Sequence, residues 1–280
     1  MLKAHTGYVL RFLQCIKTRQ LRRFSIRIDD GAVAEARDII RLIASRWPDL
    51  LSMSIELGDS HRNEDLERTT INHADLAPLT CCRHLQNLGV LGAALVLELS
   101  DSLIADLAAA CPEMESLYLV DGEPGQRRLL PSSQLQLTAI SLVHLAKGCT
   151  KLKYVGLAVQ YTESAMDAAL VETKTGEDIA SRLTGLDLCT SIIDNVPRCA
   201  ALLTQLFPYL ATIDCAPMAF WSREMYDRLQ QIDSTTEAAR VQNVEMLISE
   251  LGVQREGRMA TVPSARARLE RTSGVQGVQL

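Results

Sequence analysis

The stretch Leu137–Val159, LTAISLVHLAKGCTKLKYVGLAV, contains an amphipathic helix pattern, then a cysteine, then a short alternating strand pattern. The same order occurs one unit earlier in Leu99–Val120, LSDSLIADLAAACPEMESLYLV, and more loosely in Asp75–Val90, DLAPLTCCRHLQNLGV. In all three units a cysteine stands three residues before the apolar residue that opens the pattern L-x-x-L-x-L, namely Cys82, Cys111 and Cys149. The chain therefore contains an internal repeat, and this repeat predicts the fold before any chemistry is considered.

The strand pattern of this repeat occurs at four further places. The seven strand cores begin at residues 21, 50, 85, 114, 152, 183 and 210, which lie between 27 and 38 residues apart. This distance holds one strand, one helix and their loops, and a repeat array tolerates variation of this kind because insertions fall in the loops. The sequence predicts an α/β solenoid of about seven irregular strand–helix repeats, a horseshoe with a parallel sheet on its concave side and the helices outside.

The repeat pattern divides the chain into four parts. Residues 1–20 read as an incomplete repeat, a helix whose strand is missing, so that the first full strand would have an open edge unless a preceding segment or a partner covers it. Residues 21–220 form the repeat region, with Ser100 and Thr138 as helix caps; the apolar run Leu91–Leu97 has no place in the pattern. Residues 221–252 predict two capping helices, 221–232 and 236–251, and residues 253–280 predict a disordered basic tail.

Composition excludes several classes of protein. With 47% hydrophobic and 22% charged residues, the 280-residue chain can bury a large core. It has no apolar run near the roughly 18 residues that span a bilayer, and no secretion signal, so we expect an intracellular protein, cytoplasmic or nuclear, without a membrane partner. A formal charge of −5 and 4% aromatic residues argue against nucleic acid as a partner. The repeat positions of its cysteines favour reduced, structural thiols.

No catalytic or cofactor motif stands out, and we expect neither an enzyme nor a bound cofactor. Cys81 and Cys82 near His73 and His84 are the one group that resembles metal ligands, but their spacing fits no zinc pattern, so no metal site is predicted. Two carboxylates, Asp187 and Asp214, occupy equivalent positions of neighbouring repeats. We interpret them as part of a solvated acidic face.

Alternation within the strands predicts a binding wall. If the leucine positions point into the core, the residues between them line the concave side. The wall would be basic at its start, neutral with two tyrosines in its middle and acidic at its end, with the tyrosines as anchors of a protein-binding patch or as ordinary exposed strand residues. The predicted protein-binding residues are Arg23, Arg27, Glu56, Asn87, Tyr118, Tyr154, Asp187 and Asp214.

The order helix, cysteine, two residues and L-x-x-L-x-L resembles the cysteine-containing class of leucine-rich repeats. The whole arrangement is similar to the repeat region of F-box leucine-rich-repeat proteins, especially the divergent fungal ones. The three central repeats carry this resemblance, whereas the outer four keep only the strand pattern. The asparagine or cysteine that the family has after the strand core, with two residues between, is replaced, for example by Ala93, Gly122 and Gln160.

The resemblance implies an adaptor that holds a substrate protein on its concave wall while an F-box docks to a cullin-type ubiquitin ligase. The twenty residues before Leu21 are too few for the roughly forty-residue F-box, so ligase subunits are expected as partners only if a longer chain carries that module. The function predicted from sequence is thus protein binding, for substrate recognition or scaffolding, with an unidentified partner. A structural or vestigial solenoid without a specific partner is the alternative.

Overall fold

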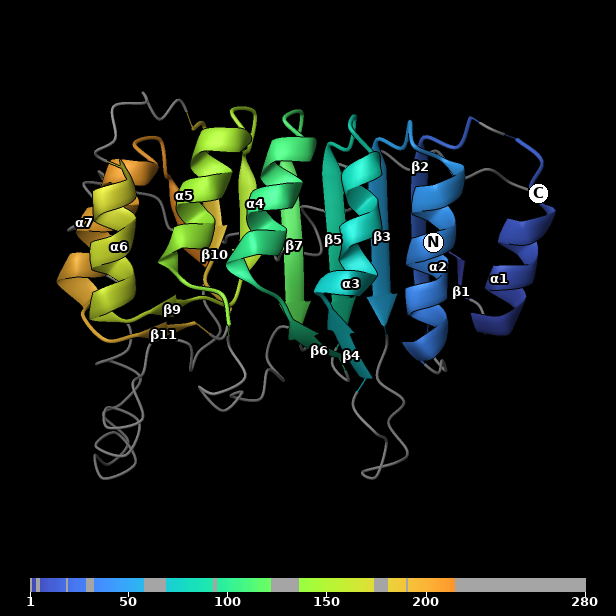
Figure 1. The fold of residues 1–280 in the computed structure, drawn as a ribbon, viewed down its shortest axis with the longest axis horizontal. Helices are drawn as coiled ribbons and strands as arrows, with labels where there is room; N and C mark the ends of the chain where they lie inside the picture. The colour runs from blue at the N-terminus through green and yellow to red at the C-terminus, as the bar shows by residue number, and fades with distance from the viewer. Residues whose placement is uncertain are drawn as a thin grey trace, which may run out of the picture.

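A large parallel sheet with helices on one face makes up the described part of the molecule (Figure 1). The computed structural model describes residues 2–3, 6–18, 20–28, 33–57, 69–92, 95–121, 136–173, 181–189 and 191–214. The sheet has eight strands in the order β1-β2-β3-β5-β7-β8-β10-β12 and is open, with β1 and β12 at its edges. In chain order these are Leu2–Lys3, Arg23–Ile28, Ser52–Leu57, Asn87–Gly92, Ser116–Asp121, Tyr154–Leu157, Gly185–Asp187 and Thr212–Asp214.

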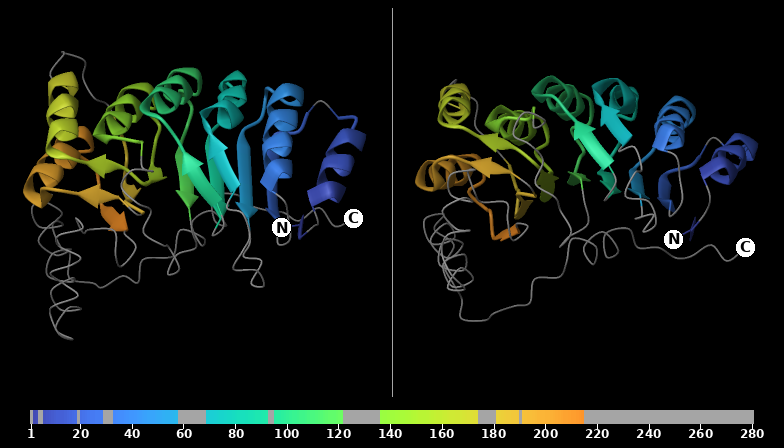
Figure 2. Two further views of the ribbon diagram at one scale, coloured as in Figure 1. Left: turned by 60° about the horizontal axis from the view of Figure 1, so that its bottom comes forward. Right: turned by 90° about the horizontal axis from the view of Figure 1, so that it is seen from below.

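The helices lie between successive strands and cover the same face of this sheet (Figures 1 and 2). The α-helices among the described residues are α1 (Thr6–Cys15), α2 (Val33–Arg46), α3 (His73–Leu76), α4 (Asp101–Ala110), α5 (Ala139–Gly148), α6 (Glu163–Thr173) and α7 (Val196–Leu206), and a 3-10 helix η1 (Ala77–Cys81) extends α3. This alternation is the α/β architecture that the repeat predicts. The predicted end segments 221–252 and 253–280 lie outside the described residues.

All seven predicted strands are present, and their predicted register is confirmed. The middle residue of each strand core pairs with its equivalent in the next strand, from Ser25 through Ser54, Gly89, Tyr118, Gly156 and Asp187 to Asp214. The residues two positions before these middle residues pair in the same way, from Arg23 in β2 to Thr212 in β12. The register follows from the sequence because every unit buries the same alternate positions against its helix.

The first unit differs from its prediction. The helix of residues 1–20 has a strand after all, because Leu2–Lys3 forms β1 and pairs in parallel with Ile26 and Arg27 of β2. A segment preceding the first full strand therefore covers part of its edge. Two residues are too few to show a period of two, so the pattern gave no sign of them.

Short strands connect the large sheet to several helices. β4 (Thr69–Asn72) pairs with β6 (Leu95–Glu98), and β9 (Gln160–Tyr161) pairs with β11 (Ile192–Ile193), in two separate two-stranded sheets. β6 accounts for the apolar run after the third strand core, since its side chains at Leu95, Val96 and Leu97 are buried. β4, β6, β9 and β11 each lead into the helix that follows.

One position of the repeat joins successive units by a side-chain hydrogen bond. The thiol of Cys111 donates to the carbonyl oxygen of Cys82 at 3.4 Å, and the thiol of Cys149 donates to that of Cys111 at 3.7 Å. Trp47 takes the place of the cysteine in the second full unit: it accepts from the Cys82 thiol at 3.8 Å and donates its indole N–H to Thr18 at 2.8 Å. We call Thr18, Trp47, Cys82, Cys111 and Cys149 the cysteine ladder.

The backbone beside the cysteine ladder repeats a second contact. In each unit two consecutive N–H groups donate to one carbonyl oxygen of the unit before, as Leu51 and Ser52 do to Arg22 at 2.7 and 3.0 Å. The same pair recurs up to Ala211 and Thr212, which donate to Thr184 at 2.9 Å each. These bonds satisfy backbone N–H groups at the first residue of each strand and at the residue before it. Neighbouring units are therefore hydrogen-bonded where each strand begins.

Helix starts are joined across units by carboxylates. Ser100 and Thr138 cap α4 and α5 as predicted, by accepting from Leu103 N and Ile140 N at 3.3 Å each. Asp101 in the first turn of α4 accepts from the backbone N–H and the hydroxyl of Thr138, at 2.8 and 2.7 Å. Asp101 thus stabilises the start of α4 and fixes the cap of α5.

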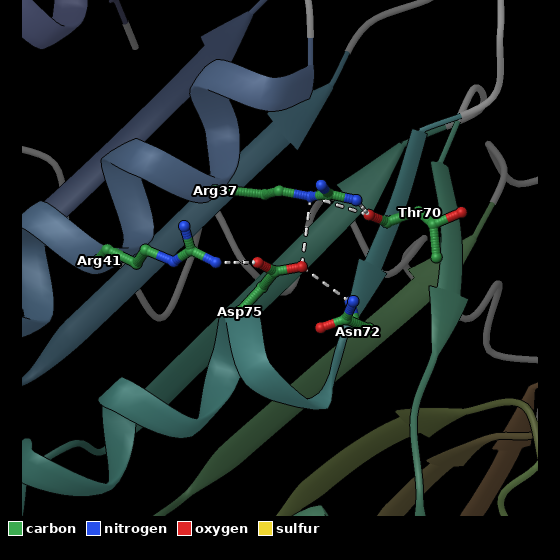
Figure 3. A network of polar contacts seen from close by, with 5 residues as sticks. All are labelled: Arg37, Arg41, Thr70, Asn72 and Asp75. Atoms are coloured by element: carbon green, nitrogen blue, oxygen red, sulfur yellow. Dashed lines mark hydrogen bonds and ion pairs between the residues drawn. The ribbon is translucent and has the colours of Figure 1, made fainter.

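A second carboxylate of this kind is buried (Figure 3). Asp75 in α3 is 2% exposed and forms ion pairs with Arg41 at 2.8 Å and Arg37 at 3.3 Å, both from α2. It also accepts from the backbone N–H of Asn72 at 3.1 Å, and Arg37 donates to the carbonyl oxygen of Thr70 at 3.0 Å. Two cations and a backbone donor compensate the buried charge, so we assign Asp75 a structural role.

Close packing of α4 on α5 generates a first prediction. A Cβ on Gly148 would lie 2.8 Å from both the Cβ and the carbonyl oxygen of Ala108. Gly148→Ala should therefore lower the free energy of unfolding by about 1–3 kcal/mol, measured by urea denaturation, because backbone must shift to admit the methyl group. Ala109→Ser on the exposed side of α4 is the control and should change it by less than about 0.5 kcal/mol. Equal effects of the two substitutions would contradict this packing.

The cysteine ladder generates a second prediction. The seven cysteines within the described ranges are free thiols, of which Cys15 and Cys81 are exposed. Burial raises the pKa of the Cys82 thiol to about 11 and the pKa values of Cys111 and Cys149 to about 12 each. At pH 8 iodoacetamide should label the two exposed cysteines within minutes and leave these three unlabelled, as peptide mass spectrometry would measure. Labelling of all five at similar rates without denaturant would show that the ladder is not buried.

Candidate functional site

The large sheet has a face opposite the described helices (Figure 2). The residues predicted from the sequence to bind a partner map to this face. Within each strand, alternate side chains enter the main core, as Phe24, Ile26 and Ile28 do in β2. The residues between them point the other way. We call this second set the open face. The backbone positions of all eight predicted binding residues are in it: Arg23, Arg27, Glu56, Asn87, Tyr118, Tyr154, Asp187 and Asp214.

On its first strands, β2 and β3, the open face carries polar side chains. Arg27 in β2 and Glu56 in β3 are register partners and form an ion pair at 2.6 Å, with side chains 17% and 25% exposed. The pair makes this part less basic than the sequence suggested, because Glu56 neutralises the charge of Arg27. Arg23 remains exposed at the beginning of β2. Three polar side chains lie beside this pair: Ser25 is exposed, and Ser54 and Asn87 are half-buried.

The two tyrosines lie over glycines of the next strand. Tyr118 pairs with Gly156, and Tyr154 pairs with Gly185. A Cβ on Gly156 would lie 2.6 Å from Cδ1 of Tyr118, and a Cβ on Gly185 would lie 2.7 Å from Cδ1 of Tyr154. Each ring therefore occupies the space that a side chain would fill, an arrangement that also shields the glycine backbone. This contact fixes the position of both rings.

A second apolar cluster surrounds these rings, separate from the main core. It contains Tyr118, Val120, Ala158 and Cys189, with Leu91, Tyr154 and Ile192 packed against it. We call these seven residues the open-face cluster. Tyr118 is only 3% exposed, whereas Tyr154 is half-buried. Of the two interpretations of the tyrosines, binding anchors or ordinary exposed strand residues, the second therefore does not hold for Tyr118.

The acidic end of the open face also differs from its prediction. Asp187 is 6% exposed, not solvated, and its Oδ1 accepts from the backbone N–H of Cys189 at 2.8 Å. That bond closes a tight turn in which Cys189 has a φ of 53°, the left-handed region that non-glycine residues seldom adopt. Asp214 is the register partner of Asp187, as predicted. The side chain of Asp214 lies outside the described residues.

The open-face cluster extends beyond the residues chosen from sequence. In four successive repeats, the residue two positions after the middle of the strand core is apolar, as the repeat alignment shows. These residues are Leu91, Val120, Ala158 and Cys189. They were not selected because the selection favoured charged and aromatic side chains. Ile192 belongs to β11, outside the repeat pattern, so no sequence signal pointed to it.

The cysteine and histidine group does not come together as a metal site. Cys82 is buried in the cysteine ladder, whereas Cys81 is exposed. His73 contacts Ser100 through Nδ1 at 3.0 Å. Across the described ranges, no three His, Cys, Asp or Glu residues lie close enough to hold a metal ion. No helix among those described has the length and hydropathy to cross a membrane.

A scan against models of known protein families found no match, and a search of curated proteins found no similar sequence.

The contact between Tyr118 and Gly156 generates a third prediction. Gly156→Ala should lower the free energy of unfolding by about 1–3 kcal/mol, because the methyl group displaces the ring. In a Tyr118→Ala background the same substitution should cost less than about 1 kcal/mol, since only Cγ2 of Val120, at 3.3 Å, then remains near the methyl group. Urea denaturation of the four members of this double-mutant cycle would measure the coupling. An equal cost in both backgrounds would mean that the ring does not occupy this space.

Proposed function

We propose that this chain is a protein-binding module of the leucine-rich-repeat type and that the open face is its recognition surface. The observation that supports this most directly is the open-face cluster, whose members Leu91, Tyr154 and Ile192 are partly exposed around a buried centre. A monomeric sheet face with no partner needs no second apolar cluster, because polar side chains would keep it solvated. Here aromatic and aliphatic side chains gather on the middle strands, with polar residues on β2 and β3 beside them.

The chemistry of the open face suits a protein partner. Tyrosine contributes contact area with little loss of conformational freedom and retains a hydroxyl for hydrogen bonding. Tyr154 is half-buried and held over Gly185, so its accessible edge is already ordered before any partner arrives. Arg23, Ser54 and Asn87 would supply the polar rim that protein interfaces have around an apolar centre.

The assignment to leucine-rich repeats, and to a ubiquitin-ligase adaptor in particular, rests on the sequence resemblance. A horseshoe of leucine-rich repeats agrees with the parallel sheet, the one-sided helices and the cysteine ladder. An adaptor role in a ubiquitin ligase would further require an F-box joined to the repeats, and we keep it as the family-derived form of the proposal. Substrate recognition or scaffolding by the open face does not depend on it.

A fourth prediction tests the surface itself. Ser54→Arg and Asn87→Arg, on neighbouring strands of the open face, should each reduce partner capture at least about tenfold by placing a long cation in the interface. Ala109→Arg on exposed α4 adds the same side chain on the helix side and should leave capture unchanged. Affinity purification of the tagged full chain from its native cell extract, with quantitative mass spectrometry, measures the capture.

Stability must be followed in the same variants. None of the three positions is buried, so thermal unfolding should shift little in any of them. Capture of the same proteins by the open-face variants and the helix variant would reject the open face as a recognition surface and favour the alternative, a structural array without a specific partner there. Ligase subunits among proteins that all variants retain would support the adaptor form.

A further inference from the structure

The first unit of the array and the rest of the chain have opposite charges. Residues 1–28, a tenth of the chain, contain seven Lys and Arg residues and no Asp or Glu. The remaining residues contain 22 Lys and Arg against 34 Asp and Glu, a net charge of −12. Salt screens exposed charges that are more than about 8–10 Å apart. The charge of +7 therefore acts on whatever lies against the first unit, whereas a larger ligand would also meet the negative remainder.

The first helix, α1, adds exposed apolar side chains at this positive end. Tyr8 is 71% exposed and Phe12 is 51% exposed. Arg11 and Cys15 are exposed as well, and the four residues are three or four positions apart, so they lie along one side of the helix. We call Tyr8, Arg11, Phe12 and Cys15 the α1 stripe. Two exposed aromatic side chains beside a guanidinium are typical of a binding site, because the terminal unit of a repeat array is otherwise polar on its outer side.

Contacts with the core and with α2 hold the α1 stripe in place. α1 lies at the end of the row of helices, beside α2 (Figure 1), and its Val9 and Leu13 are buried in the main core. The guanidinium of Arg46 in α2 donates to the carbonyl oxygens of Leu13 and Gln14 at 2.8 and 3.0 Å. These bonds satisfy carbonyl groups in the last turn of α1 and place a further cation there. A partner would therefore meet a surface that is already ordered, which lowers the entropic cost of binding.

The charge of the first unit distinguishes between possible occupants of the α1 stripe. A second copy docked symmetrically would bring two surfaces of like charge together, which costs affinity. Nucleic acid or an anionic membrane extends beyond the first unit and would meet the net charge of −12 on the remaining residues. A short acidic segment of another protein meets the positive charge alone, and its apolar side chains would cover the two aromatic rings.

We propose that the α1 stripe binds an acidic amphipathic helix of another protein. Apolar side chains of that helix pack on Tyr8 and Phe12, and its carboxylates pair with Arg11 and with Lys17, which is exposed just beyond α1. The stripe belongs to the helix layer, on the other side of the sheet from the open face (Figure 2). The proposal is therefore independent of recognition by the open face, and the two surfaces together would let the array hold two proteins at once.

Binding of a synthetic helix provides the fifth prediction. The probe is a capped peptide of about fifteen residues, with leucine at positions i, i+3, i+4 and i+7 of a helix and glutamate and alanine elsewhere. Calorimetric titration of the full chain should show binding that weakens at least about tenfold in Tyr8→Ser/Phe12→Ser, since both anchors are lost. Arg11→Glu should weaken binding at least about fivefold, because it reverses the charge beside the anchors. Arg83→Glu, the same charge change at another exposed position, should alter it less than about twofold.

Two further measurements test the charge of the peptide and the place where it binds. The same peptide with glutamine at every glutamate position should bind at least about tenfold more weakly at low salt. Saturating acidic peptide should slow iodoacetamide labelling of Cys15 at least about fivefold and leave the rate of Cys81, which is exposed in η1, unchanged. Failure of the acidic peptide to bind, equal affinity for the two peptides, or an unchanged labelling rate of Cys15 would overturn the proposal.

Folding and other polyanions are controlled in the same variants. The substituted side chains are exposed, so thermal unfolding should shift little, and Cys111 should stay unlabelled throughout. Vesicles of phosphatidylcholine with phosphatidylserine, and single-stranded RNA, should bind more weakly than the peptide at the same salt concentration. Tighter binding of either one that is lost in Tyr8→Ser/Phe12→Ser would overturn the proposal and assign the stripe to that polyanion. Ser54→Arg should leave peptide binding unchanged, so this proposal and open-face recognition can fail separately.

Discussion

The fold depends on the way each repeat unit bonds to the unit before it. At the residue that precedes a strand core by three positions, a thiol or an indole N–H donates to the carbonyl oxygen of the equivalent residue one unit earlier, from Trp47 to Cys149. Beside it, two backbone N–H groups share one carbonyl oxygen of the same neighbour. Because these bonds fix where each strand begins, they also fix its register, and the register places the outward columns of the open face. Burial keeps the thiols protonated, so they act as small apolar donors and not as nucleophiles.

The open face results from the same register. Glycines at 156 and 185 leave room for the tyrosine rings of the preceding strands, and the rings in turn shield the glycine backbone. The apolar residues two positions after the middle of the strand cores then pack around Tyr118 and form a second cluster on the side of the sheet opposite the helices. Charge is arranged around this cluster and not within it: the Arg27–Glu56 pair lies on the early strands, while Asp187 is held in a turn by the Cys189 N–H group. Such a surface combines an ordered apolar centre with adaptable polar surroundings.

Sequence reasoning succeeded where a contact repeats and failed where it is singular. The seven strands, their register and the caps at Ser100 and Thr138 follow from a pattern that each unit shows again. Strand β1 was missed because two residues show no period, and the short strands β4, β6, β9 and β11 were missed because they lie outside the repeat. The burial of Tyr118 depends on the side chains of a second cluster, and that of Asp187 accompanies a single turn, so alternation alone predicted exposed side chains. The repeat pattern did not identify Trp47 as a member of the cysteine ladder, because its size and chemistry differ from those of the cysteines at the equivalent position.

Bonds that join only neighbouring units also determine how the molecule responds to mechanical load. A pull on the two ends of the array acts on one inter-unit boundary at a time, because the large sheet runs as a single series from β1 to β12. The outermost unit would peel away first and release about thirty residues, roughly 100 Å of extended chain, before the next boundary is loaded. The cross-links between helix starts, such as Asp101 with Thr138, resist this peeling at the edge away from the cysteine ladder. The array would therefore lengthen under tension in discrete steps of about one repeat, as an extensible tether.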